Sequence, residues 1–224
     1  MKVNEIFNSY QGEGINIGVP TTFVRLSGCN FRCTFCDTLY ALDEEGKEYT
    51  PSNLALEINK ISSLGKTQNI CITGGEPLIQ KKSLEELVET LHNQNHFIEI
   101  ETNGSIFPSD KLFDYVNQWN VSFKMENSGM KERYNPETIK KWSQKSKEQD
   151  NIYFKFVVEK GSDLIELESF VIKYALPRNQ VILMPEGIDR ETIIKRTKWL
   201  MGRPLGYRII PRLHIIVYGN ERKR

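Results

Sequence analysis

Cys29, Cys33 and Cys36 stand close together in the run GCNFRCTFCDT (Gly28–Thr38), with the spacing C-x3-C-x2-C. Cysteine thiolates hold iron–sulfur clusters, and a four-iron cluster usually receives a thiolate on every iron. A cluster held by these three cysteines alone would therefore keep one iron free of protein ligands. In zinc sites an open position separates catalytic from structural metal, and the same logic applies here. The spacing predicts an iron–sulfur cluster that takes part in chemistry.

Two simpler interpretations compete with the cluster. Cys33 and Cys36 alone form a C-x2-C pair, which also occurs in zinc sites and redox pairs. A zinc site would need a second pair of ligands, and no two of the remaining candidates are closely paired. A disulfide is not expected, because the sequence shows no secretory leader and the cytoplasm keeps thiols reduced. The remaining cysteine and the histidines are Cys71, His92, His96 and His214.

A second motif, Gly74-Gly75-Glu76-Pro77, directly follows the short apolar run at residues 70–72. Two glycines let a backbone approach a ligand closely and expose its N–H and C=O groups. The Glu76 carboxylate and nearby carbonyls could accept hydrogen bonds from an ammonium group. A tight turn that places Pro77 at the first position of a helix is the alternative. The cysteine motif one strand earlier favours the ligand-binding interpretation.

The two motifs together resemble the radical S-adenosylmethionine (SAM) superfamily. In that superfamily the open iron chelates the amino and carboxylate groups of SAM, and an electron splits SAM into methionine and a 5'-deoxyadenosyl radical. Three further segments resemble the 7-carboxy-7-deazaguanine synthase family, namely QGEG at 11–14, F-x-R-x-x-G-C at 23–29 and C-D-T at 36–38. The resemblance continues through 73–77, 100–104 and the tail from His214 to Asn220, so it spans nearly the whole chain.

This resemblance implies the conversion of 6-carboxy-5,6,7,8-tetrahydropterin into 7-carboxy-7-deazaguanine with loss of ammonia, on the route to queuosine. It implies one 4Fe-4S cluster, SAM as a regenerated cofactor, Mg²⁺, an electron donor such as a flavodoxin, and a homodimer. Two alternatives stay open, namely an activating enzyme for a glycyl-radical protein and a non-catalytic iron–sulfur or zinc scaffold. The QGEG and C-D-T elements argue against the first, because a protein substrate needs no purine-reading pocket.

The resemblance also implies site residues. Arg25 would suit a bidentate contact with the substrate carboxylate, and Thr38 would be the Mg²⁺ ligand, because Mg²⁺ prefers oxygen donors. Phe123 and Met184 depart from the family pattern, since they replace a proline and a glutamine. The expected substrate-binding residues are Tyr10, Gln11, Gly12, Glu13, Arg25, Thr73 and His214. The expected cofactor-binding residues are Phe35, Asp37, Gly75, Glu76, Ser122, Phe123, Lys124, Met184, Pro185, Glu186 and Gly187.

Apolar runs alternate with helix-period segments along the chain, which predicts βαβ units and a parallel sheet covered by helices. We expect an α/β fold, a partial (βα)6-type open TIM-like barrel of the radical SAM kind. An open doubly wound sheet is the competing architecture. The motifs follow the expected strands, so they should meet on the face where parallel strands end. Strands are expected at 21–26, 70–72, 97–101, 121–123, 152–158, 181–183 and 207–210, and helices at 51–64, 84–91, 112–119, from 136, 164–174 and 193–200.

The chain has 224 residues, with 30 basic and 29 acidic side chains and a net charge of +1. This length fits a single radical SAM domain over residues 1–224. The balanced charge argues against a dedicated partner such as nucleic acid or a membrane surface. No apolar run approaches the ~20 residues that a membrane span requires. A cytoplasmic enzyme is therefore expected.

Overall fold

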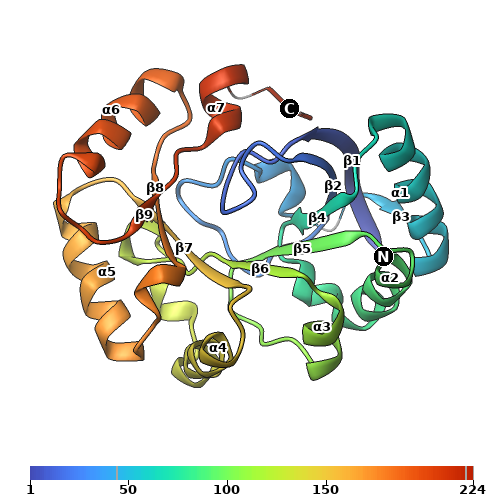
Figure 1. Cartoon of the computed structure of the whole chain (residues 1–224), viewed down its shortest axis with the longest axis horizontal. Helices are drawn as coiled ribbons and strands as arrows, with labels where there is room; N and C mark the ends of the chain where they lie inside the picture. Colours follow the sequence, from blue (N-terminus) through green and yellow to red (C-terminus); the bar gives the residue numbers. More distant parts are fainter. Residues whose placement is uncertain (44, 220, 224) are drawn as a thin grey trace.

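The computed structural model describes residues 1–43, 45–219 and 221–223, and all strands of this part join one nine-stranded sheet (Figure 1). The strands are β1 (Lys2–Tyr10), β2 (Pro20–Leu26), β3 (Lys47–Glu48), β4 (Asn69–Gly74), β5 (Phe97–Thr102), β6 (Gln118–Val121), β7 (Ile152–Val158), β8 (Val181–Pro185) and β9 (Arg208–Ile209). The helices are α1 (Pro51–Gly65), α2 (Lys81–Asn93), α3 (Asp110–Tyr115), α4 (Pro136–Glu148), α5 (Gly161–Tyr174), α6 (Arg190–Met201) and α7 (Leu213–Tyr218).

The sheet runs in the order β3-β1-β2-β4-β5-β6-β7-β8-β9. Strands from β2 to β9 pair in parallel, whereas β1 pairs antiparallel with both β2 and β3. From β2 onward the order follows the chain without the reversal that a doubly wound sheet requires. Helices α1 to α6 surround the outside of the curved sheet (Figure 1). The expected open TIM-like barrel is confirmed.

Alternation along β7 shows how the sheet divides its side chains. Phe154 and Phe156 belong to the apolar core between sheet and helices, whereas Lys155 and Val157 line the barrel interior. Successive strand residues point to opposite faces, so one strand serves packing and site together. The same division places Ile98 and Ile100 of β5 in the core.

The expected helix at 112–119 is wrong at its C-terminal end. Helix α3 ends at Tyr115, Val116 has an extended backbone (φ −87°, ψ 120°), and Trp119 lies in β6. The Asn117 side chain accepts a hydrogen bond from the Ile98 N–H (2.8 Å), which fixes the chain beside β5. The apolar residues of a helix and of the strand that follows it can thus be spaced like the apolar face of one longer helix.

Other boundaries moved less. The strand expected at 121–123 is β6, which ends at Val121, and the last strand is only Arg208–Ile209. Helix α7, which follows that strand, was not predicted.

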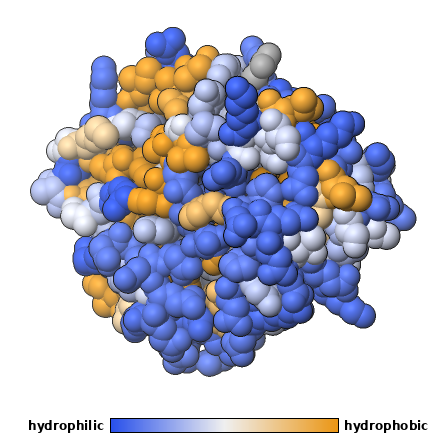
Figure 2. Space-filling view, turned by 45° about the vertical axis from the view of Figure 1, so that its right-hand side comes forward, coloured by the Kyte–Doolittle hydropathy of each residue, from blue (hydrophilic) through white to orange (hydrophobic). Residues whose placement is uncertain are grey.

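Polar side chains cover much of the face in Figure 2, and apolar ones gather mainly in its upper part. Among the described residues no helix is long and apolar enough to cross a membrane.

Candidate active site

A cavity of about 670 Å³ opens where the parallel strands end. Loops and strand ends that are far apart in the sequence contribute to its wall, as the motif positions predicted. Its size lies within the range of small-molecule sites. The predicted site residues that line it are Tyr10, Gln11, Gly12, Glu13, Arg25, Cys29, Cys33, Phe35, Cys36, Asp37, Thr38, Thr73, Gly75, Ser122, Lys124, Met184 and His214.

The three clustered cysteines are free thiols, each partly buried in this wall. Burial raises the pKa of each thiol, and the nearby Lys124 ammonium acts in the opposite direction. Among the described residues a group of three candidate ligand atoms within 4.8 Å of one another occurs at Glu13, Asp37 and His214, but not at the thiols.

Cys71, His92 and His96 do not line the cavity. Cys71 is fully buried in β4, where its sulfur accepts a hydrogen bond from the Gln11 amide (3.6 Å). His92 and His96 are engaged on the helical side, with the Tyr115 carbonyl (3.2 Å) and the Asn59 side chain (2.7 Å). Within the described part of the chain, none of these residues adds a fourth ligand beside the thiols. The residues present fit a cluster with one open iron.

Gly74 and Gly75 bring the end of β4 against the start of the cysteine loop. A Cβ atom on Gly75 would lie 1.9 Å from the Gly28 carbonyl oxygen, and one on Gly74 would lie 2.1 Å from that of Leu26. Gly74 also has a φ of +134°, which side chains rarely adopt. The Glu76 N–H donates to the Gly28 carbonyl (2.8 Å). These glycines therefore permit a close approach to neighbouring backbone, which positions Cys29.

Glu76 does not line the cavity. Its buried carboxylate accepts hydrogen bonds from the Thr102 hydroxyl (2.7 Å) and from the N–H groups of Asn103 (2.7 Å) and Leu78 (3.0 Å). Burial raises the pKa of this carboxyl, and the donated hydrogen bonds oppose that effect. Pro77 begins a short 3-10 helix (Pro77–Gln80) ahead of α2, so the turn into a helix is also present. Glu76 thus ties the end of β4 to the end of β5.

The QGEG loop meets the C-terminal helix. A Cβ on Gly12 would lie 2.3 Å from His214 Nδ1, and the Leu213 N–H donates to the Gly12 carbonyl (2.8 Å). The Gln11 side-chain amide donates to the buried Glu99 carboxylate, which anchors the loop to β5. His214 lines the cavity. The end of the predicted tail, Asn220, lies outside the described residues.

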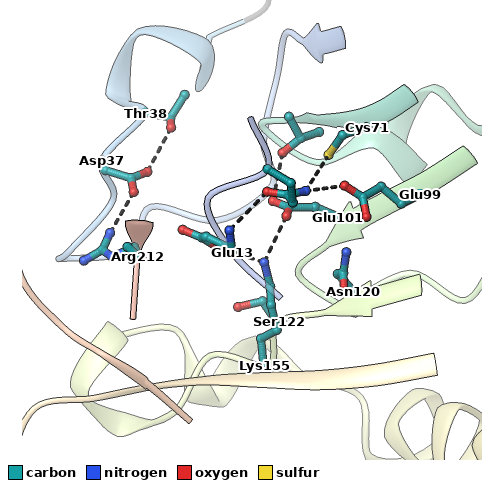
Figure 3. A network of polar contacts seen from close by, with 12 residues as sticks. Glu13, Asp37, Thr38, Cys71, Glu99, Glu101, Asn120, Ser122, Lys155 and Arg212 are labelled. Carbon is teal, nitrogen blue, oxygen red and sulfur yellow. Dashed lines mark hydrogen bonds and ion pairs between the residues drawn. The ribbon is translucent and has the colours of Figure 1, made fainter. Parts of the chain in front are cut away.

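A buried ion-pair network crosses the cavity wall (Figure 3). Lys155 Nζ lies 2.9 Å from Glu13 Oε2 and 3.1 Å from Glu101 Oε1. Thr73 donates to the other Glu101 oxygen (3.3 Å). Burial would raise the pKa of Glu13, but Lys155 and then His214 lower it to about 2. The network holds two negative charges and one positive charge beside the open space.

A second polar chain joins the cysteine loop to the C-terminal segment (Figure 3). The Thr38 hydroxyl donates to Asp37 Oδ1 (2.9 Å), and Arg212 Nη1 donates to Asp37 Oδ2 (2.8 Å). Arg212 also donates to the Gly187 carbonyl. The hydroxyl and carboxylate oxygens are hard donors of the kind that Mg²⁺ prefers.

Arg25 stands at another part of the wall, at the end of β2. Its Nε–H donates to the buried Glu5 carboxylate (2.8 Å). The Tyr40 hydroxyl (2.9 Å) and Arg222 (3.1 Å) bind the same carboxylate. The ion pair with Glu5 fixes the Arg25 guanidinium, and Arg25 lines the cavity.

The segment Ser122–Lys124 divides between the wall and the core. Lys124 Nζ donates to Ser122 Oγ (2.7 Å), and both side chains line the cavity. The Phe123 ring instead stacks on Phe154 in the core (centroids 5.7 Å apart). The Lys124 N–H donates to the Tyr134 hydroxyl (2.8 Å), which fixes the backbone where the family proline is missing.

The segment Met184–Gly187 divides in the same way. Met184 lines the cavity, whereas Pro185, Glu186 and Gly187 are not among its lining residues. The Glu186 carboxylate pairs with Arg196 of α6. Met184 and Pro185 belong to β8 rather than following it.

Sequence reasoning missed Glu101, Lys155 and Arg212 as residues of the wall. A signal existed for two of them. Lys155 interrupts the apolar run of β7, and Glu101 alternates with isoleucines in β5, so both occupy positions on the interior face. Arg212 precedes a helix that the sequence did not reveal, so no pattern marked it.

A barrel of parallel strands with three free thiols at the mouth defines a class of protein. The family model of the radical SAM superfamily matches residues 23–149, more than half of the chain. A 7-carboxy-7-deazaguanine synthase of Pyrobaculum aerophilum is 39% identical over 99% of this chain and 96% of its own length. One from Hyperthermus butylicus is 33% identical over 97% and 92%. The chain belongs to the 7-carboxy-7-deazaguanine synthase family of radical SAM enzymes.

A solved structure agrees on the fold. The crystal structure of QueE from Escherichia coli matches with a TM-score of 0.68, covering 95% of this chain and 94% of that one at 21% identity. Membership of the superfamily brings a 4Fe-4S cluster and SAM, and the thiol trio supplies ligands of the required kind.

Proposed function

We propose that this chain converts 6-carboxy-5,6,7,8-tetrahydropterin into 7-carboxy-7-deazaguanine with loss of ammonia, as a single radical SAM domain over residues 1–224. Curated relatives that match the full length bear the name of this activity. The observation that carries the proposal is that three free thiols and a buried charged network share one cavity. A cofactor held by the thiols would thus face the space where a small, polar substrate is held.

The cavity residues would serve two roles. Cys29, Cys33 and Cys36 would hold the cluster, and the cluster with SAM would supply the radical chemistry at a substrate carbon. Residues that line the cavity near the thiols would hold SAM. Neighbouring residues that do not line it would keep the SAM-holding residues in position. The SAM-holding residues in this proposal are Phe35, Asp37, Gly75, Ser122, Lys124 and Met184. The supporting residues are Glu76, Phe123, Pro185, Glu186 and Gly187.

Other residues that line the same cavity would bind the pterin. Glu13 is an ionised carboxylate that can accept from ring N–H and amino groups. Arg25 would pair with the substrate carboxylate, because a guanidinium matches its geometry. Thr73 and His214, which line the cavity, would be further polar contacts, and Tyr10, Gln11 and Gly12 would shape the loop that presents Glu13.

Magnesium and the protein partners are part of the same proposal. The Thr38 hydroxyl would bind Mg²⁺ together with oxygens from substrate and water, since Mg²⁺ is often bound by few protein groups. Glu13 and Asp37 are less suited to be its main ligands, because Lys155 and Arg212 already compensate their charges. A flavodoxin-type donor would reduce the cluster, and a homodimer would be the assembly.

The test is an anaerobic assay of reconstituted protein with SAM, a reductant, Mg²⁺ and the carboxypterin, read by mass spectrometry. We expect 7-carboxy-7-deazaguanine to form and the release of 5'-deoxyadenosine to depend on the pterin. If the release of 5'-deoxyadenosine did not depend on the pterin but increased with a protein substrate, the result would instead indicate a glycyl-radical activating enzyme.

A further inference from the structure

Lys155 is a charged residue in the middle of an apolar strand. Its side chain is only 3% exposed, and its ammonium bridges Glu13 of the QGEG loop and Glu101 of β5. A buried charge is tolerated only when it is paired and hydrogen-bonded. Three elements that are distant in sequence thus meet at one nitrogen atom at the cavity wall (Figure 3).

We propose that Lys155 is a positioning residue that holds the Glu13 and Glu101 carboxylates side by side at the cavity wall, so that Glu13 is oriented to accept hydrogen bonds from the pterin. This inference rests on the proposed function. Both carboxylates line the cavity, and each gives one oxygen to Lys155. A reduced pterin carries several ring N–H groups and an amino group, and hydrogen bonds to ionised acceptors are about twice as strong as neutral ones.

Lys155 itself is not suited to proton transfer. Burial would lower its pKa, but Glu101 and then Glu13 raise it above its usual value. An ammonium with a raised pKa stays charged at neutral pH and does not act as an acid or base there. Its contribution is therefore electrostatic and geometric.

Without the ammonium, the remaining charges would favour proton uptake. Glu13 also faces Asp37, His214 and Arg212. Glu101 faces the buried Glu99, whose pKa is raised by burial and then by Glu101 itself. Two carboxylates that share a buried site tend to retain one proton. A protonated carboxyl offers fewer acceptor sites to the pterin.

The test compares Lys155→Met, Lys155→Arg and Glu101→Gln with Lys131→Met, which removes a surface lysine paired with Glu166 (2.8 Å). The readouts are the Kd of 6-carboxypterin, from its fluorescence, and the KM of the tetrahydropterin, both between pH 6 and 9. We expect Lys155→Met and Glu101→Gln to raise the Kd at least about tenfold, as expected for loss of a charged hydrogen bond. In Lys155→Met the Kd should also rise as the pH falls.

Lys155→Arg should keep a flat pH profile, and Lys131→Met should match the wild type. A folded Lys155→Met protein with an unchanged Kd and a flat profile would overturn the positioning role. If that variant does not fold, an unchanged Kd in Glu101→Gln overturns the proposal, and a raised one supports it. A wild type that binds 6-carboxypterin but never converts the tetrahydropterin would instead reject the proposed function.

Discussion

Gly75→Ala tests how the cysteine loop is positioned. The added Cβ would lie 1.9 Å from the Gly28 carbonyl oxygen and 2.4 Å from its carbon, which is backbone and cannot rotate aside. The loop must move, and the hydrogen bonds from Glu76 to Gly28 (2.8 Å) and from Gly75 to Leu26 (3.0 Å) would weaken. Overpacking costs about 1–3 kcal/mol, and each backbone hydrogen bond contributes about 1 kcal/mol. The free energy of unfolding should therefore fall by about 2–5 kcal/mol.

The assay is urea unfolding of the apoprotein, followed by iron analysis after anaerobic reconstitution. Gly161→Ala is the matched control, because its Cβ would meet nothing within 4 Å, and it should change stability by less than about 0.5 kcal/mol. Gly75→Ala should also bind less iron, since Cys29 follows the displaced backbone. If Gly75→Ala matched the control in both measurements, the close contact would have no role in forming the site.

Cys71→Ala should cost about 1–2 kcal/mol of stability and leave iron content and turnover unchanged, because Cys71 is a core residue of β4; loss of iron in reconstituted protein would contradict this. Arg25→Ala should raise the KM for the carboxypterin more than the Kd for SAM, in steady-state and binding assays. A larger effect on the Kd for SAM would assign Arg25 to SAM binding instead. The pKa of Glu13 is lowered from 4.5 to about 2. Ionised Glu13 therefore stabilises the fold fully above pH 4.5, and this contribution to the free energy of unfolding is lost as the pH falls toward 2. That shift corresponds to about 3 kcal/mol; the difference in unfolding free energy between wild type and Glu13→Gln should shrink over this window, and a constant difference would refute the pairing with Lys155.

The fold was largely predictable from the sequence, because strand and helix periods alternate with clear turn signals. The error at Trp119 shows the limit of that approach. A period of 3.6 residues across Leu112, Tyr115 and Val116 continued by chance onto a buried strand residue. The contacts between Asn117 and Ile98 of β5, which is distant in sequence, hold the chain in an extended conformation after Tyr115.

The site was predictable at the cysteines, where a motif follows the end of a parallel strand, and at Glu13, where the QGEG motif resembles the family pattern. The strand-end argument does not cover Glu13, because β1 is antiparallel to β2 and ends where the parallel strands begin. It was not predictable where function depends on which direction a side chain points. Glu76 belongs to a motif but turns into the protein, whereas Lys155 belongs to none and completes the wall. Side-chain direction follows from tertiary contacts, such as the one that joins Glu76 to the Asn103 N–H, and a spacing pattern contains no such information.

The central claim is that three thiolates hold a four-iron cluster whose fourth iron binds SAM. It is tested most directly by iron and sulfide analysis of anaerobically reconstituted protein, combined with electron paramagnetic resonance of the reduced cluster with and without SAM. We predict about four irons per chain, a spectrum that changes when SAM is added, and loss of both in the variant with Cys29, Cys33 and Cys36 replaced by alanine. A cluster that forms without these cysteines, or a spectrum that SAM leaves unchanged, would contradict the account.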